Sequence, residues 1–154
     1  LYGTVDGFLC TLDSLNHLED LSQVKRTLEL VSLFLNPGGY FIFDVNSLYK
    51  QRCVLGDNAF LNDCGDLFCA WQNCYDENDS SVDISLDFFK REGELYRRES
   101  ENFKEIYLSS DFIENTLSQC GMALINVYDD YGESAPGELT QRITYVARKE
   151  SLKK

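Results

Sequence analysis

The feature that most constrains the fold is an apolar run, residues 40–45, which follows an amphipathic segment and a sharp turn. Apolar side chains recur at steps of three and four residues from Leu21 to Leu35, which predicts a helix with one buried stripe. Pro37 disfavours helix in the residue before it, and Gly38-Gly39 lets the chain reverse. The consecutive apolar residues that follow favour a strand covered on both faces, as in parallel sheets.

A second short apolar segment, Val5–Cys10, precedes the helix and is interrupted by Gly7. Its length favours a buried strand over a helix. Strand, helix and strand with tight connections make a βαβ unit over residues 1–50, whose two strands run parallel in one sheet. The sequence therefore predicts an α/β fold.

The middle of the chain, residues 51–107, has a different pattern. Extended segments over 68–75, 82–89 and 94–107 are separated by turn-forming residues. Along 82–89, apolar residues alternate with residues that are polar except for Phe89, which is typical of a strand with one face in water. The pattern predicts an inserted antiparallel β meander, and the family resemblance described below implies that it serves as a lid or substrate region.

The last third, residues 108–149, returns to an α/β pattern. Ser109 is a favourable N-cap for a helix, and Gly121 is a favourable residue to end it. Two further strands are expected, over 123–128 and 142–147, and together they form a hairpin.

Composition restricts the class of protein. The chain has 154 residues, of which 44% are hydrophobic, which is enough for one domain over residues 1–154 with a substantial core. The longest apolar run is far shorter than the roughly 18 residues of a membrane span, and no signal peptide is recognisable. We therefore expect a cytoplasmic protein with no membrane partner. The net charge of −12 argues against nucleic acid as a partner.

The six cysteines and the single histidine do not predict a metal site. No two cysteines have C-x-x-C spacing, and the lone His17 cannot complete a Cys/His ligand set. We therefore expect no metal, and thiols that are reduced and mostly buried.

The order of these segments resembles the second half of the class I S-adenosylmethionine-dependent methyltransferases. Residues 5–18, VDGFLCTLDSLNHL, are similar to that family's fourth strand and the loop after it, and residues 35–44, LNPGGYFIFD, resemble the start of its fifth strand. Residues 109–122 resemble the helix before the sixth strand, and residues 142–149 look like the final strand, which runs antiparallel to the others. The resemblance implies a partial Rossmann-like methyltransferase sheet, strands four to seven, with the meander inserted.

The resemblance does not include the family's glycine-rich loop, G-x-G-x-G, or the acidic residue that binds the ribose. Both would lie upstream of Val5, and Gly3 and Gly7 do not form such a loop. The resemblance therefore implies S-adenosylmethionine as the cofactor, but the main cofactor-binding half is missing here. We expect this truncated chain to be inactive alone.

The resemblance assigns roles to the loop after the first strand. Its backbone at Cys10, Thr11 and Leu12 would approach the methionine part of the cofactor. Asp13 and His17 lie beside the expected methyl-transfer point and are the candidate catalytic residues, with His17 as a general base that titrates near neutrality. The alternative is a strand-end turn without a ligand, in which Asp13 caps the turn and His17 is a surface residue.

Candidate substrate-binding residues follow the strand ends or lie in the meander. Ligands bind at the carboxyl ends of strands in open α/β sheets, which favours polar residues there. The alternative role of Asn46 is to form a turn, and the alternative role of the aromatic residues is to pack in the core. The candidates are Asn16, Asp44, Asn46, Tyr49, Trp71 and Tyr75.

Three functional hypotheses follow. The first is a methyltransferase that acts on an oxygen, nitrogen or carbon of a small molecule, with this chain supplying half the cleft. The second is a catalytically inactive fragment that binds a partner or forms a homodimer through the exposed edge of Val5–Cys10. The third is an antiparallel binding domain with an accidental likeness, which a structure without parallel strands would establish. The sequence does not identify the methyl acceptor.

Overall fold

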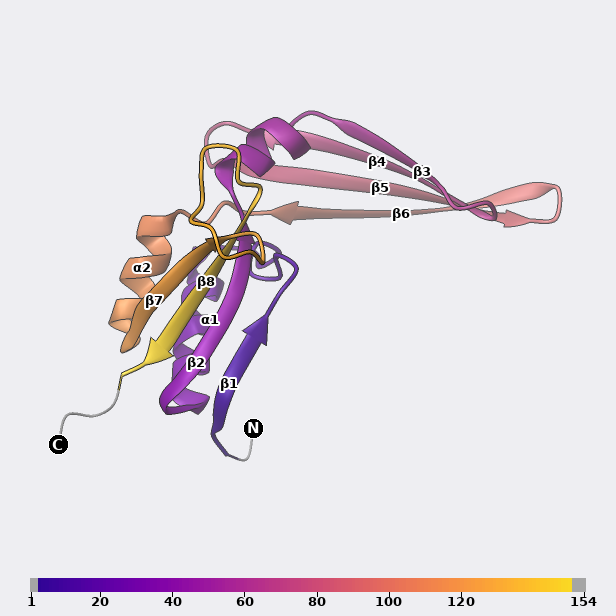
Figure 1. The fold of residues 1–154 in the computed structure, drawn as a ribbon. Helices are drawn as coiled ribbons and strands as arrows, with labels where there is room; N and C mark the ends of the chain where they lie inside the picture. The colour runs from indigo at the N-terminus through magenta and orange to yellow at the C-terminus, as the bar shows by residue number, and fades with distance from the viewer. Residues whose placement is uncertain (1–2, 151–154) are drawn as a thin grey trace.

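The computed structural model describes residues 3–150, which form two four-stranded sheets (Figure 1). The expected domain limits at residues 1 and 154 lie outside the described residues. The first sheet has the order β1-β2-β8-β7, and the second has the order β3-β4-β5-β6. The elements are β1 Val5–Cys10, α1 Leu21–Phe34, β2 Leu35–Asn46, the π-helical turn η1 Lys50–Leu55, β3 Ala59–Asp63, β4 Leu67–Asp76, β5 Ser81–Glu92, β6 Leu95–Glu105, α2 Ser110–Gln119, β7 Met122–Asp129 and β8 Arg142–Lys149.

The predicted βαβ unit is present at the edge of the first sheet. β1 and β2 run parallel, with Phe8 opposite Phe41 and Cys10 opposite Phe43. β8 lies between β2 and β7 and runs antiparallel to both. The α/β prediction is therefore confirmed, and the parallel pair rules out the purely antiparallel domain.

Helix α1 begins where the sequence predicts and ends abruptly. The side chain of Asp20 caps it by accepting a hydrogen bond of 2.9 Å from the backbone N–H of Gln23. β2 starts directly at Leu35. The turn predicted at Pro37-Gly38-Gly39 is therefore an irregularity within this strand. Pairing with β1 jumps there from Val5–Leu35 to Gly7–Tyr40.

Gly39 is required at this irregularity because the chain passes close to β1. A Cβ atom on Gly39 would lie only 2.8 Å from the carbonyl oxygen of Asp6. The Pro-Gly-Gly sequence thus lets α1 and the start of β2 pack tightly against the edge strand.

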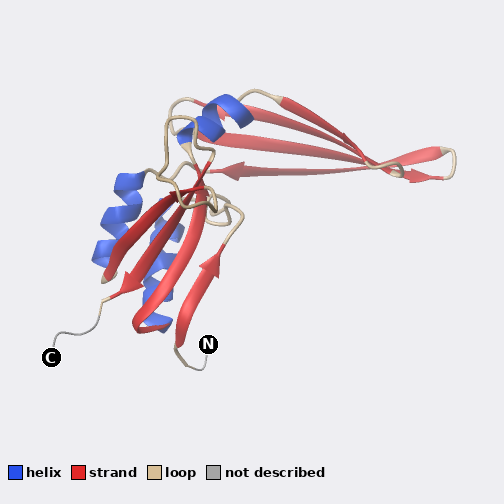
Figure 2. Ribbon diagram, viewed as in Figure 1, coloured by secondary structure: helices blue, strands red, loops and turns tan. Residues whose placement is uncertain are grey.

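The core of the first sheet lies on the face covered by α1 and α2 (Figure 2). Three buried aromatic rings stack along it: Phe41 and Phe43 at 4.6 Å between centroids, and Phe43 and Tyr145 at 5.2 Å. On the opposite face of β2, Tyr40 is 43% exposed. On the same face, however, Asp44 and Asn46 are fully buried. The expected burial of β2 on both faces is therefore met toward its carboxyl end and fails at Tyr40.

Helix α2 follows the prediction at both ends. Ser109 accepts a hydrogen bond from the backbone N–H of Phe112 at 3.2 Å, as an N-cap does. Gly121, with φ of +70°, follows the helix and allows the chain to turn into β7.

The insert is a meander of four strands, which we call the arm (residues 59–105), and it extends away from the first sheet (Figure 1). Its first strand, β3, was not predicted. The predicted alternation holds near the first sheet, where Val82 and Ile84 are buried. Farther out it fails, since residues 86–89 are all half-buried. Residues 95–102 of the neighbouring β6 are all exposed, so both faces of that strand meet water.

The six cysteines are free, as predicted, but none is buried. Cys53, Cys64 and Cys74 are exposed and the others are half-buried, so the prediction of mostly buried thiols is wrong. Three of the six lie in the arm, which has too little core to bury them. Among the described residues, no helix combines the length and the apolar character needed to cross a bilayer.

Leu28 of α1 is fully buried in the core, whereas Leu33 of the same helix is 63% exposed. We expect Leu28→Ala to lower the free energy of unfolding by about 2–5 kcal/mol, because it leaves a cavity. The matched change Leu33→Ala should alter it by less than about 0.5 kcal/mol. Urea denaturation followed by circular dichroism measures both, and equal effects would contradict the packing described.

Candidate functional site

The loop after β1, the end of β2 and the end of β6 meet where the arm leaves the first sheet (Figure 1). Buried Asn16 joins them: its Oδ1 accepts the backbone N–H of Asn46 at 3.1 Å, and its Nδ2 donates to the carbonyl oxygen of Ile106 at 2.8 Å. The backbone N–H of Ile106 also donates to the carbonyl oxygen of Asn16. Asn16 therefore holds three distant segments together.

The fully buried carboxylate of Asp44 holds the turn after β1. It accepts the backbone N–H groups of Leu12 at 2.9 Å and of Asp13 at 2.7 Å. These two residues have φ values of +60° and +51°, a conformation that is unfavourable for residues other than glycine. The two hydrogen bonds to a charged acceptor stabilise this strained turn, which contains the predicted cofactor-binding stretch.

Arg142 of β8 completes the environment of Asp44. Its guanidinium donates to both Asp44 and Asp13, the latter at 3.1 Å, and the hydroxyl of Tyr131 donates to Asp44 at 3.0 Å. Burial lowers the pKa of Arg142, but the two carboxylates outweigh it and raise that pKa overall. Arg142 also lines a cavity of about 390 Å³ beside the site. No local pattern pointed to Arg142 or Tyr131, because both are far from Asp44 along the chain.

Asn46 links two carboxylates at the end of β2. Its Nδ2 donates to Asp13 and to Glu105, both at 2.7 Å, while its Oδ1 has no partner among the described residues. Burial raises the pKa of Glu105, the hydrogen bond from Asn46 lowers it, and the charge of Asp13 raises it further, with a net upward shift. Glu105 was not predicted as a site residue, because it ends a strand assigned only to the meander.

His17 lies at the open side of this group. Its Nε2 is 3.7 Å from Oε1 of Glu105, and its ring centroid is 5.3 Å from that of Phe103. The His17 side chain is 41% exposed, whereas that of Glu105 is 6% exposed. One polar atom from each of Asp13, His17 and Glu105 lies within 4.8 Å of the others. The structure thus brings the two predicted catalytic residues together with a buried acid.

The predicted cofactor-binding residues lie on the turn that Asp44 holds. Thr11 and Leu12 are exposed, Leu12 by 68%, and Cys10 is half-buried against the core. Burial raises the pKa of the Cys10 thiol, which favours its protonated form.

The predicted aromatic residues lie nearer the arm. Trp71 and Tyr75 pack against the small apolar cluster of the arm, with the Trp71 ring 5.3 Å from Phe60. These contacts are the ones expected if the two aromatic residues pack in a core and do not bind substrate. Tyr49 is half-buried and directly precedes η1. Their substrate-binding roles stay predictions.

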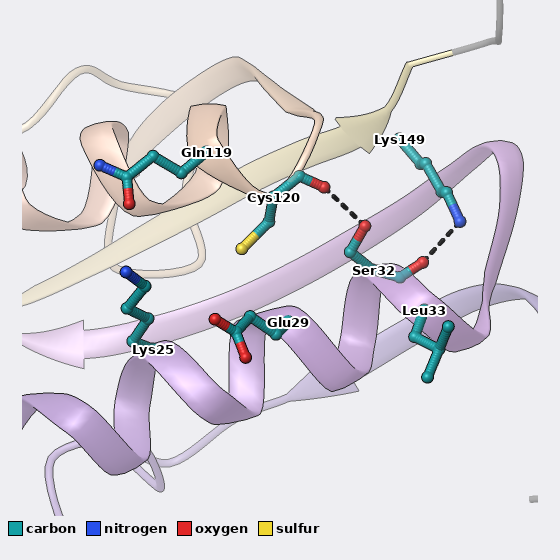
Figure 3. Close-up of a pocket in the computed structure, with 7 residues that line it drawn as sticks. All are labelled: Lys25, Glu29, Ser32, Leu33, Gln119, Cys120 and Lys149. Carbon is teal, nitrogen blue, oxygen red and sulfur yellow. Dashed lines mark hydrogen bonds between the residues drawn. The ribbon is translucent and has the colours of Figure 1, made fainter.

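A cavity of about 590 Å³ lies elsewhere, between α1, α2 and β8 (Figure 3). Lys149 donates from its Nζ to the carbonyl oxygens of Ser32 and Leu35, at 2.6 and 2.8 Å, and the Ser32 hydroxyl donates to the carbonyl oxygen of Cys120. The two bonds from Lys149 satisfy carbonyl groups at the end of α1, and the bond from Ser32 satisfies one at the end of α2. The predicted site residues do not line this cavity, and its polar contacts stabilise the helix end.

Comparison with known proteins gives no match to a family model, but it finds similar individual proteins. Over 96% of its length, the chain is 30% identical to YqeM of Bacillus subtilis (strain 168), whose name describes a methyltransferase. It is 34% identical to the S-adenosylmethionine-dependent methyltransferase from Clostridium acetobutylicum ATCC 824, with a TM-score of 0.87 over 98% of the chain.

At 15% identity, the chain shares its fold with CalS10, an amino pentose methyltransferase from Micromonospora echinaspora whose structure contains bound S-adenosylmethionine. The TM-score is 0.71 over 97% of the chain and 60% of CalS10. The chain spans 60% of YqeM and 61% of the clostridial protein. Over the part of the relatives that it spans, the chain therefore has the methyltransferase fold and is similar in sequence to S-adenosylmethionine-dependent methyltransferases.

Proposed function

We propose that the chain supplies the acceptor side of a methyltransferase that moves a methyl group from S-adenosylmethionine to a small molecule. The observation that carries the proposal is the turn at Leu12 and Asp13, which Asp44 holds at the carboxyl ends of two parallel strands. Ligands bind at this position in open α/β sheets. The 34% identity to a methyltransferase over nearly the whole chain supports the same function.

The residues after β1 fit the methionine part of the cofactor. Thr11 and Leu12 are exposed on a turn of fixed conformation, so a ligand can approach them without displacing the core. We assign this contact to Cys10, Thr11 and Leu12. The ribose and the adenine would need the glycine-rich loop and the acidic residue that this sequence lacks.

His17 and Asp13 are proposed to act on the methyl acceptor. The bound cofactor supplies an electrophilic methyl group, so the protein mainly has to align the acceptor with it and remove a proton. His17 is exposed enough to reach an acceptor and lies beside the buried Glu105. Asp13 is fixed by Arg142 and Asn46, which keeps its carboxylate at the same place.

A protein extended upstream to the length of its relatives should bind S-adenosylhomocysteine with a micromolar Kd, about −8 kcal/mol. The present chain alone should bind it more weakly, because it lacks the glycine-rich loop. Isothermal titration calorimetry measures both proteins. An absence of binding heat for the extended protein, with S-adenosylhomocysteine and with S-adenosylmethionine, would contradict the proposed function.

In the extended protein, Asp44→Asn should weaken S-adenosylhomocysteine binding. The turn loses hydrogen bonds to a charged group, which contribute about 1.5–3 kcal/mol, or roughly tenfold to hundredfold in Kd. Asp83→Asn, at an exposed carboxylate on β5, is the control and should leave the Kd unchanged. Circular dichroism checks that both variants are folded. Equal affinities in the two variants would argue against the role of Asp44.

A second candidate function is self-association as an inactive fragment. β1 is the edge strand of the first sheet, and Leu9 on it is 74% exposed. An apolar edge with unpaired backbone groups is a template for another strand, here β1 of a second copy across a two-fold axis.

This candidate predicts a dimer of the 154-residue chain at high micromolar concentration, measured by light scattering or sedimentation. Leu9→Lys should shift the chain toward monomer, because charged edge residues oppose strand pairing. Leu95→Lys, at a residue of the arm that is 75% exposed, is the matched control. A monomeric wild-type chain would refute the edge-strand dimer.

A further inference from the structure

We propose that Asp13, His17 and Glu105 bind the ammonium group of an amine, which makes the methyl acceptor a nitrogen. The inference rests on the proposed methyl transfer for the reaction of the bound amine. The binding of the amine is tested below without any methyl transfer. The three residues come from the loop after β1 and from the end of β6, so only the folded chain assembles them.

The polar atoms of the cluster are close enough together to share one ammonium group, although the 3.7 Å between Nε2 of His17 and Oε1 of Glu105 is shorter than the tetrahedral value. An ammonium group directs its N–H bonds tetrahedrally, so three acceptors at about 2.8 Å from the nitrogen lie about 4.6 Å apart. The carboxylates of Asp13 and Glu105 and the neutral imidazole of His17 are all acceptors, and their atoms lie within 4.8 Å of one another.

The amide of Asn46 shows that an N–H donor group fits between these carboxylates. Its Nδ2 donates to Asp13 and Glu105 at 2.7 Å each, although the residue is fully buried. The Oδ1 atom of the same amide has no partner among the described residues, and a buried acceptor without a partner is unfavourable. If a ligand supplies the N–H groups, the amide can rotate and Oδ1 becomes a further acceptor.

The charge of the site also favours a cation. Asp13, Asp44 and Glu105 contribute three carboxylates, and Arg142 is paired with the first two. Glu105 is buried, and among the described residues the basic side chains that act on it are His17 at 3.7 Å and, farther away, Lys50. A positively charged ligand would compensate the carboxylate that Arg142 does not reach. The 41% exposure of the His17 side chain leaves this side open to solvent.

The cluster can also prepare the nitrogen for methyl transfer. An ammonium has no lone pair, so one proton must leave before the nitrogen can react. Nε2 of His17 accepts that proton, and the nearby Glu105 carboxylate stabilises the resulting imidazolium. The nitrogen lone pair then forms a bond to the methyl carbon, the carbon–sulfur bond breaks, and its electron pair stays on the sulfur as S-adenosylhomocysteine leaves.

The single histidine makes a direct test possible. The ring signals of His17 in the 154-residue chain are followed by NMR during titration with methylammonium chloride, at constant pH and ionic strength. We expect a saturable shift with a Kd of about 1 mM, about −4 kcal/mol, as for a minimal ligand. Tetramethylammonium, which has no N–H groups, should give no saturable shift.

Glu105→Gln keeps the shape of the side chain and should weaken methylammonium binding at least tenfold, whereas Asp83→Asn should leave it unchanged. If Glu105→Gln does not fold, Asp13→Asn replaces it. The proposal is overturned by the absence of a saturable shift, by equal binding of tetramethylammonium, or by unchanged binding in the carboxylate variant. Saturable broadening of the His17 signals by micromolar Mn²⁺ would also overturn it and would identify a metal site. None of these outcomes depends on methyl transfer, so this proposal can fail while the proposed function stands.

Discussion

The buried carboxylate of Asp44 is the interaction on which the site depends. It lies near the carboxyl end of β2, the inner strand that pairs with both β1 and β8. A charge in that position is stable only with several partners, and Leu12, Asp13, Tyr131 and Arg142 all donate to it. One side chain therefore fixes the turn after β1, the orientation of Arg142 and the place of Asp13.

The second set of contacts joins the arm to the sheet. Asn16 and Asn46 bridge the loop after β1, the end of β2 and the region of Glu105 and Ile106. Because these amides are buried, their hydrogen bonds are not exchanged with water and the junction is well defined. The geometry of the cluster around His17 is therefore coupled to the base of the arm, while the distant half of the arm, exposed on both faces, contributes little to it.

The distribution of apolar side chains explains why the site depends on the first sheet and the base of the arm but little on the distant half of the arm. The large core lies between the first sheet and the two helices, whereas the arm has only a small cluster around Val82 and Ile84. The large core supplies the rigid strand ends on which the turn at Leu12 is built. The small cluster extends to Phe103, which contacts His17, so the arm provides one wall of the candidate site.

The sequence by itself determined those helices and strands whose signals lie within a few neighbouring residues. The periodicity of α1, the cap at Ser109, and the apolar runs of β1 and β2 depend on neighbouring residues, and the structure contains all of them. Only the tertiary structure decided which polar residues share a site. Arg142, Tyr131 and Glu105 reach Asp13 and Asp44 from distant strands and loops, and no spacing in a single sequence records such contacts. Asn16 and Asp44 were predicted to bind substrate because of their positions at the strand ends. In the folded chain both are buried and hydrogen-bonded to distant backbone groups, which a single sequence does not record either.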